Sequence, residues 1–135
     1  MRIFKPSLNR GQTLVEFALL LPALLLLTVV TLDLGRGVYY YSVIYNAARE
    51  GARYAIVHQQ QYNTIPVDVA GIEAAVRNKA IGLDQSKLEL IPAPQIITNT
   101  IKVEVTYTFE PVTPLGLFSI DDFDLHSSST MLIER

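Results

Sequence analysis

The feature that most constrains this chain is an apolar run near its N-terminus. From Phe17 to Leu32 there is no charged residue, and most side chains are Leu, Val or Ala. Counted from Gln12, the segment spans about 30 Å as an α-helix, which matches the apolar thickness of a bilayer. A chain of 135 residues forms one modest domain, which cannot cover so uniformly apolar a helix on all sides. The segment is therefore predicted to cross a membrane.

The charges on either side of this run predict its orientation. Arg2, Lys5 and Arg10 precede it, whereas Asp33 follows it at once and Arg36 is the nearest base beyond. Because basic residues stay on the cytoplasmic side, we expect a single pass through the cytoplasmic (inner) membrane, with an extracytoplasmic C-terminal part. A cleaved secretory signal is the alternative, but the run is long for a signal core and no small-x-small cleavage site follows it.

Composition excludes several classes of protein. The first 57 residues carry 6 basic and 3 acidic groups (+3), and the remaining 78 carry 5 and 10 (−5), which together give the formal net charge of −2. An acidic C-terminal part with scattered lysines and arginines argues against nucleic-acid binding, which needs clustered cations. The absence of cysteine excludes disulfides and thiolate metal sites.

A short motif lies at the boundary between the basic and apolar segments. The residues Arg10-Gly11-Gln12-Thr13-Leu14-Val15-Glu16-Phe17 resemble the processing site of type IV prepilins, in which a basic leader ends in Gly and the fifth mature residue is Glu. The resemblance implies that a prepilin peptidase cuts between Gly11 and Gln12. Gln12 stands where many type IV pilins have Phe.

The resemblance continues along the next forty residues. Val15-Glu16-Phe17-Ala18-Leu19, Leu21-Pro22, Asp33-Leu34-Gly35-Arg36 and the segment Asn46-Ala47-Ala48-Arg49-Glu50-Gly51-Ala52-Arg53-Tyr54-Ala55 are similar to the TadE-like family of tight-adherence systems. The resemblance covers about the first 55 residues. It implies a pilin-like structural subunit that is inserted in the membrane, processed and assembled with other pilins on a pilus platform.

Two residues inside the apolar segment carry a physical cost. A carboxylate at Glu16, about one turn into the segment, must reach the headgroups, become protonated or meet a cation. One interpretation is an interfacial glutamate; the other is that cleavage exposes an α-ammonium at Gln12, which pairs with Glu16 of a neighbouring subunit. Pro22 removes a helical hydrogen bond, and we expect a kink there.

The helical pattern extends well beyond the membrane. An apolar stripe with spacings of three and four predicts one helix from about Gln12 to Val57, with these residues on one face: Val38, Tyr41, Ile44, Tyr45, Ala48, Ala52, Ala55 and Ile56. Its small residues, including Ala48, Gly51, Ala52 and Ala55, allow close approach of another element. Packing against the chain's own sheet is one interpretation, and docking of a neighbouring pilin is the other.

The C-terminal part is predicted to be an α+β head. Residues 67–81, with Val69, Ile72, Val76 and Ala80 on one face, predict a short amphipathic helix. Alternating apolar residues predict strands at 88–91, 101–110 and 123–133. Since about three short antiparallel strands cannot bury their apolar face alone, we expect the long helix and the short helix to cover them in a pilin-like fold.

Together these features predict a structural protein. Residues 1–11 form a leader, residues 12–57 a transmembrane and stalk helix, and residues 58–135 the head. The sequence has no phosphate-binding loop or nucleophile elbow, and Asp121, Asp122 and Asp124 lack the spacing of a calcium loop, so we expect no catalytic residue, cofactor, metal or small-molecule substrate. We expect a minor pilin or pseudopilin that acts in secretion and adhesion; a tethered extracytoplasmic binding module is the alternative, and an anchored hydrolase has no supporting motif.

Overall fold

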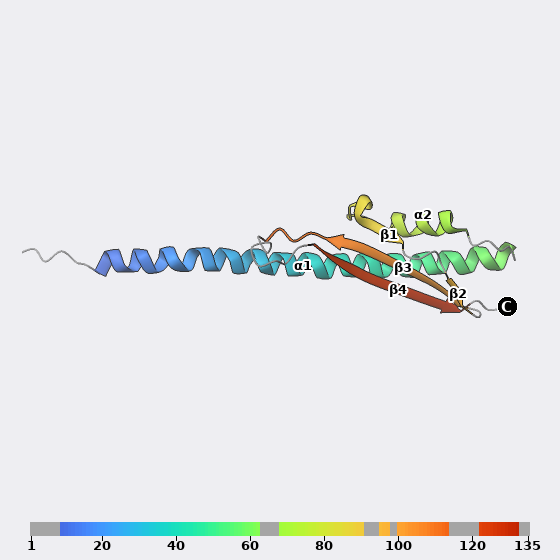
Figure 1. Ribbon diagram of the computed structural model, residues 1–135, viewed down its shortest axis with the longest axis horizontal. Helices are drawn as coiled ribbons and strands as arrows, with labels where there is room; N and C mark the ends of the chain where they lie inside the picture. Colours follow the sequence, from blue (N-terminus) through green and yellow to red (C-terminus); the bar gives the residue numbers. More distant parts are fainter. Residues whose placement is uncertain (1–8, 63–67, 91–94, 98–99, 114–121, 133–135) are drawn as a thin grey trace, which may run out of the picture.

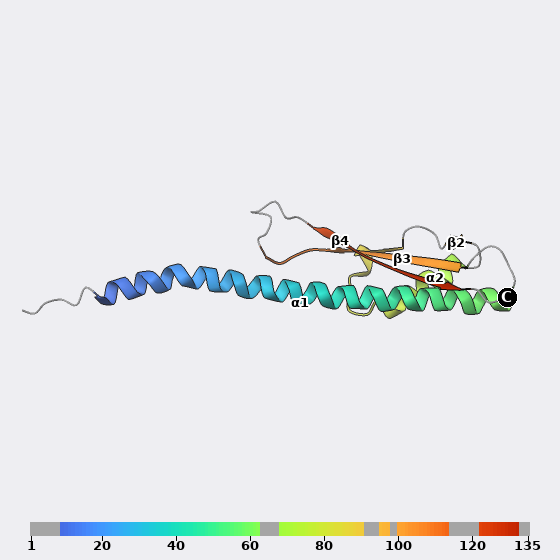
Figure 2. The same ribbon diagram turned by 90° about the horizontal axis from the view of Figure 1, so that it is seen from below.

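The molecule is a long helix with a small head along its C-terminal half (Figure 1). The computed structural model describes residues 9–62, 68–90, 95–97, 100–113 and 122–132. The two α-helices are α1 (Asn9–Tyr62) and α2 (Val69–Lys79), and a short 3₁₀ turn, Gln85–Lys87, precedes the sheet. Within the described residues, no other element lies beside the N-terminal part of α1 (Figures 1 and 2). The predicted α+β class, with one long and one short helix, is confirmed.

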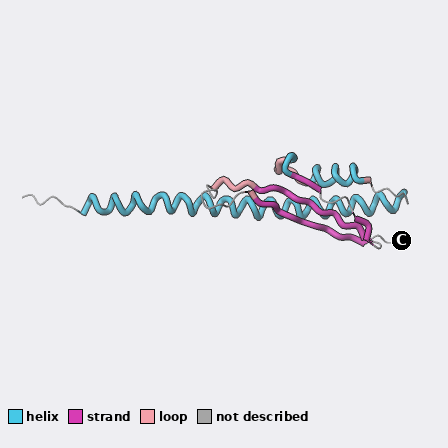
Figure 3. The backbone as a smooth tube through the Cα atoms, in the orientation of Figure 1, coloured by secondary structure: helices cyan, strands magenta, loops and turns pink. Residues whose placement is uncertain are grey.

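The sheet is antiparallel and centred on one long strand (Figure 3). Its strands are β1 (Leu88–Leu90), β2 (Gln95–Ile97), β3 (Thr100–Phe109) and β4 (Phe123–Leu132). Strand β4 pairs with the whole of β3, while β1 pairs with residues 105–107 and β2 with residues 100–102. Because β4 occupies one edge of β3, the two short strands share the other edge, and the sheet is three strands wide. The short strand β2 was not predicted.

One face of β3 forms the centre of the core. Its alternate residues Ile101, Val103, Val105, Tyr107 and Phe109 are all at most 5% exposed. Helix α1 covers one face of the sheet (Figure 2), and the first four of these residues form one buried cluster with Ala48 and Ala52 of α1. The opposite face is polar, as expected for a strand with alternating side chains.

Small side chains bring α1 close to the sheet and to α2. The residues predicted to pack the stalk, Ala48, Gly51, Ala52 and Ala55, are all buried. At Gly51 even a methyl group would lie 2.6 Å from a Val76 side-chain carbon. The chain's own head therefore occupies this surface of α1.

Part of the predicted apolar stripe is not buried by the head. Val38, Tyr41 and Tyr45 are 72%, 49% and 43% exposed, whereas Tyr40 packs against the core. Both 40 and 41 lie within a helical turn of Ile44, so spacing alone did not distinguish them. Tyr40 packs against the core because its ring centre lies 5.4 Å from that of Tyr107 and 5.7 Å from that of Phe109.

Helix α2 is fastened to α1 at its beginning. The Asp68 carboxylate accepts a hydrogen bond from the Gly71 N–H at 3.0 Å, which caps the helix, and another from the Tyr54 hydroxyl at 3.2 Å. Ile72 and Val76 are fully buried as predicted, but Val69 is 43% exposed.

The helix continues through Pro22 without a break. Figure 2 shows that the blue, N-terminal part of α1 curves relative to the rest. Pro22 has no N–H to donate, which leaves the carbonyl of Ala18 without its usual helical partner. A kink at this residue stays a prediction.

Ala52→Leu should lower the free energy of unfolding of the head by about 1 to 3 kcal/mol, because Ala52 is fully buried and a larger side chain overfills the contact with the sheet. Urea unfolding of the full chain in detergent micelles, followed by the near-UV signal of the tyrosines, measures this change. Arg53→Leu is the matched control, since the Arg53 side chain is 72% exposed and should tolerate the same substitution. Equal midpoints for the two variants would contradict the close packing.

Candidate functional site

The predicted processing site lies in the first turns of α1. Gly11, Gln12 and Glu16 are all exposed, and nothing lies within 4 Å of a side chain added at Gly11. The Gln12 side-chain amide donates to the Glu16 carboxylate at 3.2 Å, one turn along the helix. Residues 1–8 of the predicted leader lie outside the described residues. The predicted site is therefore helical and exposed.

The apolar part of α1 is bare. Its most apolar 18-residue window has a mean hydropathy of 2.4, and none of that window is buried. The hydroxyls of Thr28 and Thr31 donate to the carbonyls of Leu24 and Leu27, both at 2.8 Å, so these polar groups are satisfied within the helix. This N-terminal apolar helix is compatible with a single-pass membrane anchor.

A buried carboxylate ties the head to α1 at the end of the apolar run. Asp33 is only 7% exposed, and it accepts hydrogen bonds from the backbone N–H of Val112 at 3.1 Å and of Thr113 at 2.7 Å. The Thr113 hydroxyl also donates to it. These bonds join positions about 80 residues apart in the sequence, and we call them the Asp33 clamp.

Arg36 completes the clamp from the next turn of the helix. Its guanidinium lies 2.8 Å from Asp33 and packs over the rings of Tyr40 and Phe109, at 5.6 and 5.3 Å from their centres. The ion pair is thus partly screened from water, and the arginine connects the carboxylate to the aromatic edge of the core. A spacing of three residues along a helix would by itself indicate only a weak surface pair.

The environment of Asp33 favours its charged form. Burial alone would raise the pKa of this carboxyl, but hydrogen bonds from Thr113, Val112 and Arg36 outweigh it and lower the pKa from 3.8 to about 2. Asp33 lies just beyond the predicted membrane segment. Its hydrogen-bond donors are Val112 and Thr113 of the head and Arg36 of α1. At neutral pH the clamp is therefore anionic and fully hydrogen-bonded.

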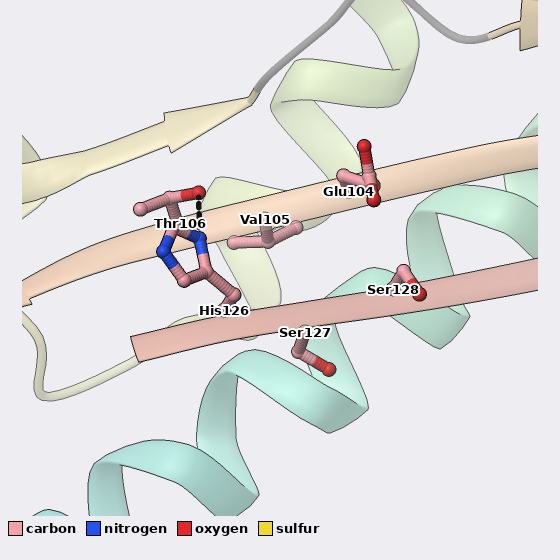
Figure 4. A pocket seen from close by; sticks show the side chains of 6 residues that line it. All are labelled: Glu104, Val105, Thr106, His126, Ser127 and Ser128. Carbon is pink, nitrogen blue, oxygen red and sulfur yellow. Dashed lines mark hydrogen bonds between the residues drawn. The ribbon is translucent and has the colours of Figure 1, made fainter. Parts of the chain in front are cut away.

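The outer face of the sheet carries a shallow polar pocket of about 260 Å³ (Figure 4). In it the Thr106 hydroxyl and the His126 Nδ1 lie 3.0 Å apart, while Glu104 pairs with Lys102 at 2.7 Å. The described residues place no carboxylate on the His126 ring to orient it as a base, and they hold no group of three metal-ligating side chains. The Asp124 carboxylate accepts a hydrogen bond from the Thr108 hydroxyl at 2.8 Å. Asp121 lies outside the described residues.

The apolar anchor, the helical half of the clamp and most of the small-residue face are consecutive in the sequence. Residues 11–53 match the TadE-like protein family. The resemblance drawn from the motifs around Gly11 and Glu16 is confirmed. No curated protein and no solved structure matches the chain. The TadE-like family suggests involvement in tight-adherence pilus systems, and the TadE-like segment ends just before the last buried turn of α1, so the sheet lies outside it.

Sequence analysis missed the clamp because its two halves are far apart. Asp33 and Arg36 were noted as part of the TadE-like motif, but Val112 and Thr113 lie in a stretch of sequence with no distinctive pattern. The one available signal was an acidic residue placed directly after an apolar run, where a charge needs a partner.

The stability of the head should depend on pH through Asp33. A lowered pKa stabilises the folded state above about pH 4, and this contribution, about 2 kcal/mol, is lost as the pH falls toward 2. Urea unfolding of the full chain in micelles at pH 5 and pH 2 tests this, with Asp33→Asn as the variant that removes the titrating group. The stability advantage of the wild type over Asp33→Asn should shrink by that amount between the two pH values.

The control for this experiment is Asp122→Asn, which removes an exposed carboxylate at the start of β4. It should keep the pH dependence of the wild type. A constant difference between the wild type and Asp33→Asn from pH 5 to pH 2 would contradict the role assigned to Asp33.

Proposed function

We propose that this chain is a minor pilin or pseudopilin of a tight-adherence pilus, held in the cytoplasmic membrane by α1 before assembly. The observation that carries the proposal is the division of α1. Its TadE-like segment is exposed from Gly11 to Thr28, and its first buried residue is Asp33, where the head is attached. A helix whose apolar half is not covered by its own head can leave the lipid bilayer and pack against the helices of other subunits.

The bare half of α1 has the features that such an exchange needs. It is long enough to cross the membrane, and its threonine hydroxyls already have acceptors within the helix. Its one charged group after Arg10 is Glu16, which is exposed and accepts a hydrogen bond from the Gln12 side chain. In a bundle of low dielectric constant, a cation from another chain stabilises a carboxylate so placed.

Processing supplies that cation. Cleavage by a prepilin peptidase between Gly11 and Gln12 creates an α-ammonium one helical turn before Glu16. Pairing of this ammonium with Glu16 of a neighbouring subunit neutralises both charges and sets the axial register of the packed helices. Pro22 adds a local weakness in the helix that neighbours can accommodate.

The proposal assigns the remaining parts of the chain as well. The basic residues Arg2, Lys5 and Arg10 keep the N-terminus in the cytoplasm, where the peptidase site lies, and the head is extracytoplasmic. The partners are the membrane, the peptidase, other pilins and the assembly platform. The chain acts as a structural subunit of a filament for adhesion or secretion and not as an enzyme, with no small-molecule substrate.

Two substitutions separate processing from assembly. Gly11→Leu should leave membrane insertion intact but block cleavage, since bulk is introduced at the scissile bond. Glu16→Ala should permit cleavage but strongly reduce incorporation into filaments, because removing one partner of a buried ion pair costs about 3 to 5 kcal/mol. An immunoblot of cells and of sheared surface filaments reports both steps, through the loss of residues 1–11 and through the amount of subunit in filaments.

Matched controls come from the same helix. Gly35→Leu introduces the same side chain at a glycine with open space around it, and Glu50→Ala removes a half-exposed glutamate of the stalk. Both should be processed and assembled normally. If Gly11→Leu is cleaved like the wild type, or if both test variants support normal piliation, a membrane-tethered binding module outside the filament becomes the better account.

A further inference from the structure

We propose that the end of the head nearest the membrane is a lipid-binding surface, which rests on the outer leaflet and accepts an acyl chain in a groove beside α1. The inference rests on the membrane anchoring proposed above. We call this surface the base of the head. It consists of the exposed side chains of Val112 and Phe123 together with the apolar groove lined chiefly by Val30, Leu34, Val38, Tyr41, Phe109 and Leu125.

The Asp33 clamp fixes the height of this surface. The backbone N–H of Val112 lies 3.1 Å from the Asp33 carboxylate, and Asp33 is the first residue after the apolar run. If Gln12 to Leu32 spans the bilayer, Val112 lies at the level where α1 leaves the hydrocarbon. Its side chain is 70% exposed at this depth, and that of Phe123, at the same end of the sheet, is 46% exposed.

The groove continues the lipid-facing surface of the helix. It has a volume of about 360 Å³, and among its lining residues only Asp33 and Thr113 are polar, with their side chains joined in the clamp. Val30, Leu34, Val38 and Tyr41 follow one another at helical spacings along its wall. Two of these, Val38 and Tyr41, belong to the apolar stripe predicted from the sequence, and the head leaves them exposed. Their apolar character is explained if lipid covers them.

The charges near the base favour the acyl region of a lipid over an anionic headgroup. The nearest cation, Arg36, is already held by Asp33 and by the rings of Tyr40 and Phe109. The described acidic residues flanking Phe123, Asp122 and Asp124, are exposed and would repel a phosphate. We therefore expect the base to contact lipid through its apolar side chains, with Tyr41 and Phe123 at the membrane interface.

Tryptophan scanning tests this contact directly, because the natural chain contains no tryptophan. Val112→Trp and Phe123→Trp each place one fluorophore on the base, in the full chain reconstituted into phosphatidylcholine vesicles. Leu25→Trp is the reference within the membrane segment. Val57→Trp is the reference in water, since this exposed residue lies about 36 Å along the helix beyond Asp33. Circular dichroism equal to that of the wild type identifies folded variants.

The emission of both base variants should be shifted to the blue relative to Val57→Trp. A lipid-borne quencher close to the headgroup should reduce this emission more than a quencher placed deep in the acyl chains. Leu25→Trp should show the reverse order, and Val57→Trp no loss. Base variants quenched no more than Val57→Trp, while Leu25→Trp is quenched, would overturn the inference but leave the anchor intact. A blue shift that grows with the protein-to-lipid ratio, without quenching by lipid, would also overturn the inference, because it would show that a second copy of the chain covers the base. An unquenched Leu25→Trp would refute the anchor itself.

Discussion

The buried carboxylate of Asp33 joins the two halves of this molecule. A charged group with 7% exposure would be unfavourable alone, but three donors from the loop after β3 and the guanidinium of Arg36 satisfy it. Because the donors come from the far end of the chain, the carboxylate fixes where the head begins along α1. The order of apolar segment, clamp and head along α1 follows from this one placement.

Beyond the clamp, α1 changes from a helix suited to lipid into one suited to a protein core. From Phe17 to Leu32 its side chains are mostly Leu, Val and Ala, and after Asp33 the buried stripe consists of alanines, a glycine and Ile44. Leucines on this stripe would hold α2 and the sheet away, as the contact of Gly51 with Val76 shows. One continuous helix thus has an exposed apolar part and a part packed against the head, and the side-chain volume along it changes at the point where the carboxylate is buried.

How much the sequence predicts depends on whether a feature is local. The apolar run, the helix 67–81 and the alternation in 101–110 each rest on neighbouring residues, and the structure places α1, α2 and β3 there within a few residues. The strand β2 has only three residues, which pair with residues 100–102 of β3. So short a segment has no periodic pattern from which a strand could be predicted. Tyr40 was missed for a related reason, since its burial depends on rings that lie more than 60 residues away.

The family resemblance contributed what periodicity does not. It singled out Gly11 and Glu16, which touch nothing in the head, as residues that matter through other molecules. The structure agrees only in leaving them exposed, and their roles in cleavage and assembly stay predictions. The clamp, by contrast, is visible only in three dimensions, although its helical half lies within the TadE-like segment.

Amide hydrogen exchange at Val112 and Thr113 tests the central claim, which is that Asp33 fastens the head at the end of the membrane segment. Both residues lie outside the strands, yet their N–H groups donate to Asp33, so in the full chain in micelles they should exchange slowly. Asp33→Ala should release these two amides while those of Val103 and Val105 in β3 stay protected. Fast exchange of Val112 and Thr113 in the wild type, or unchanged protection in Asp33→Ala, would contradict the account.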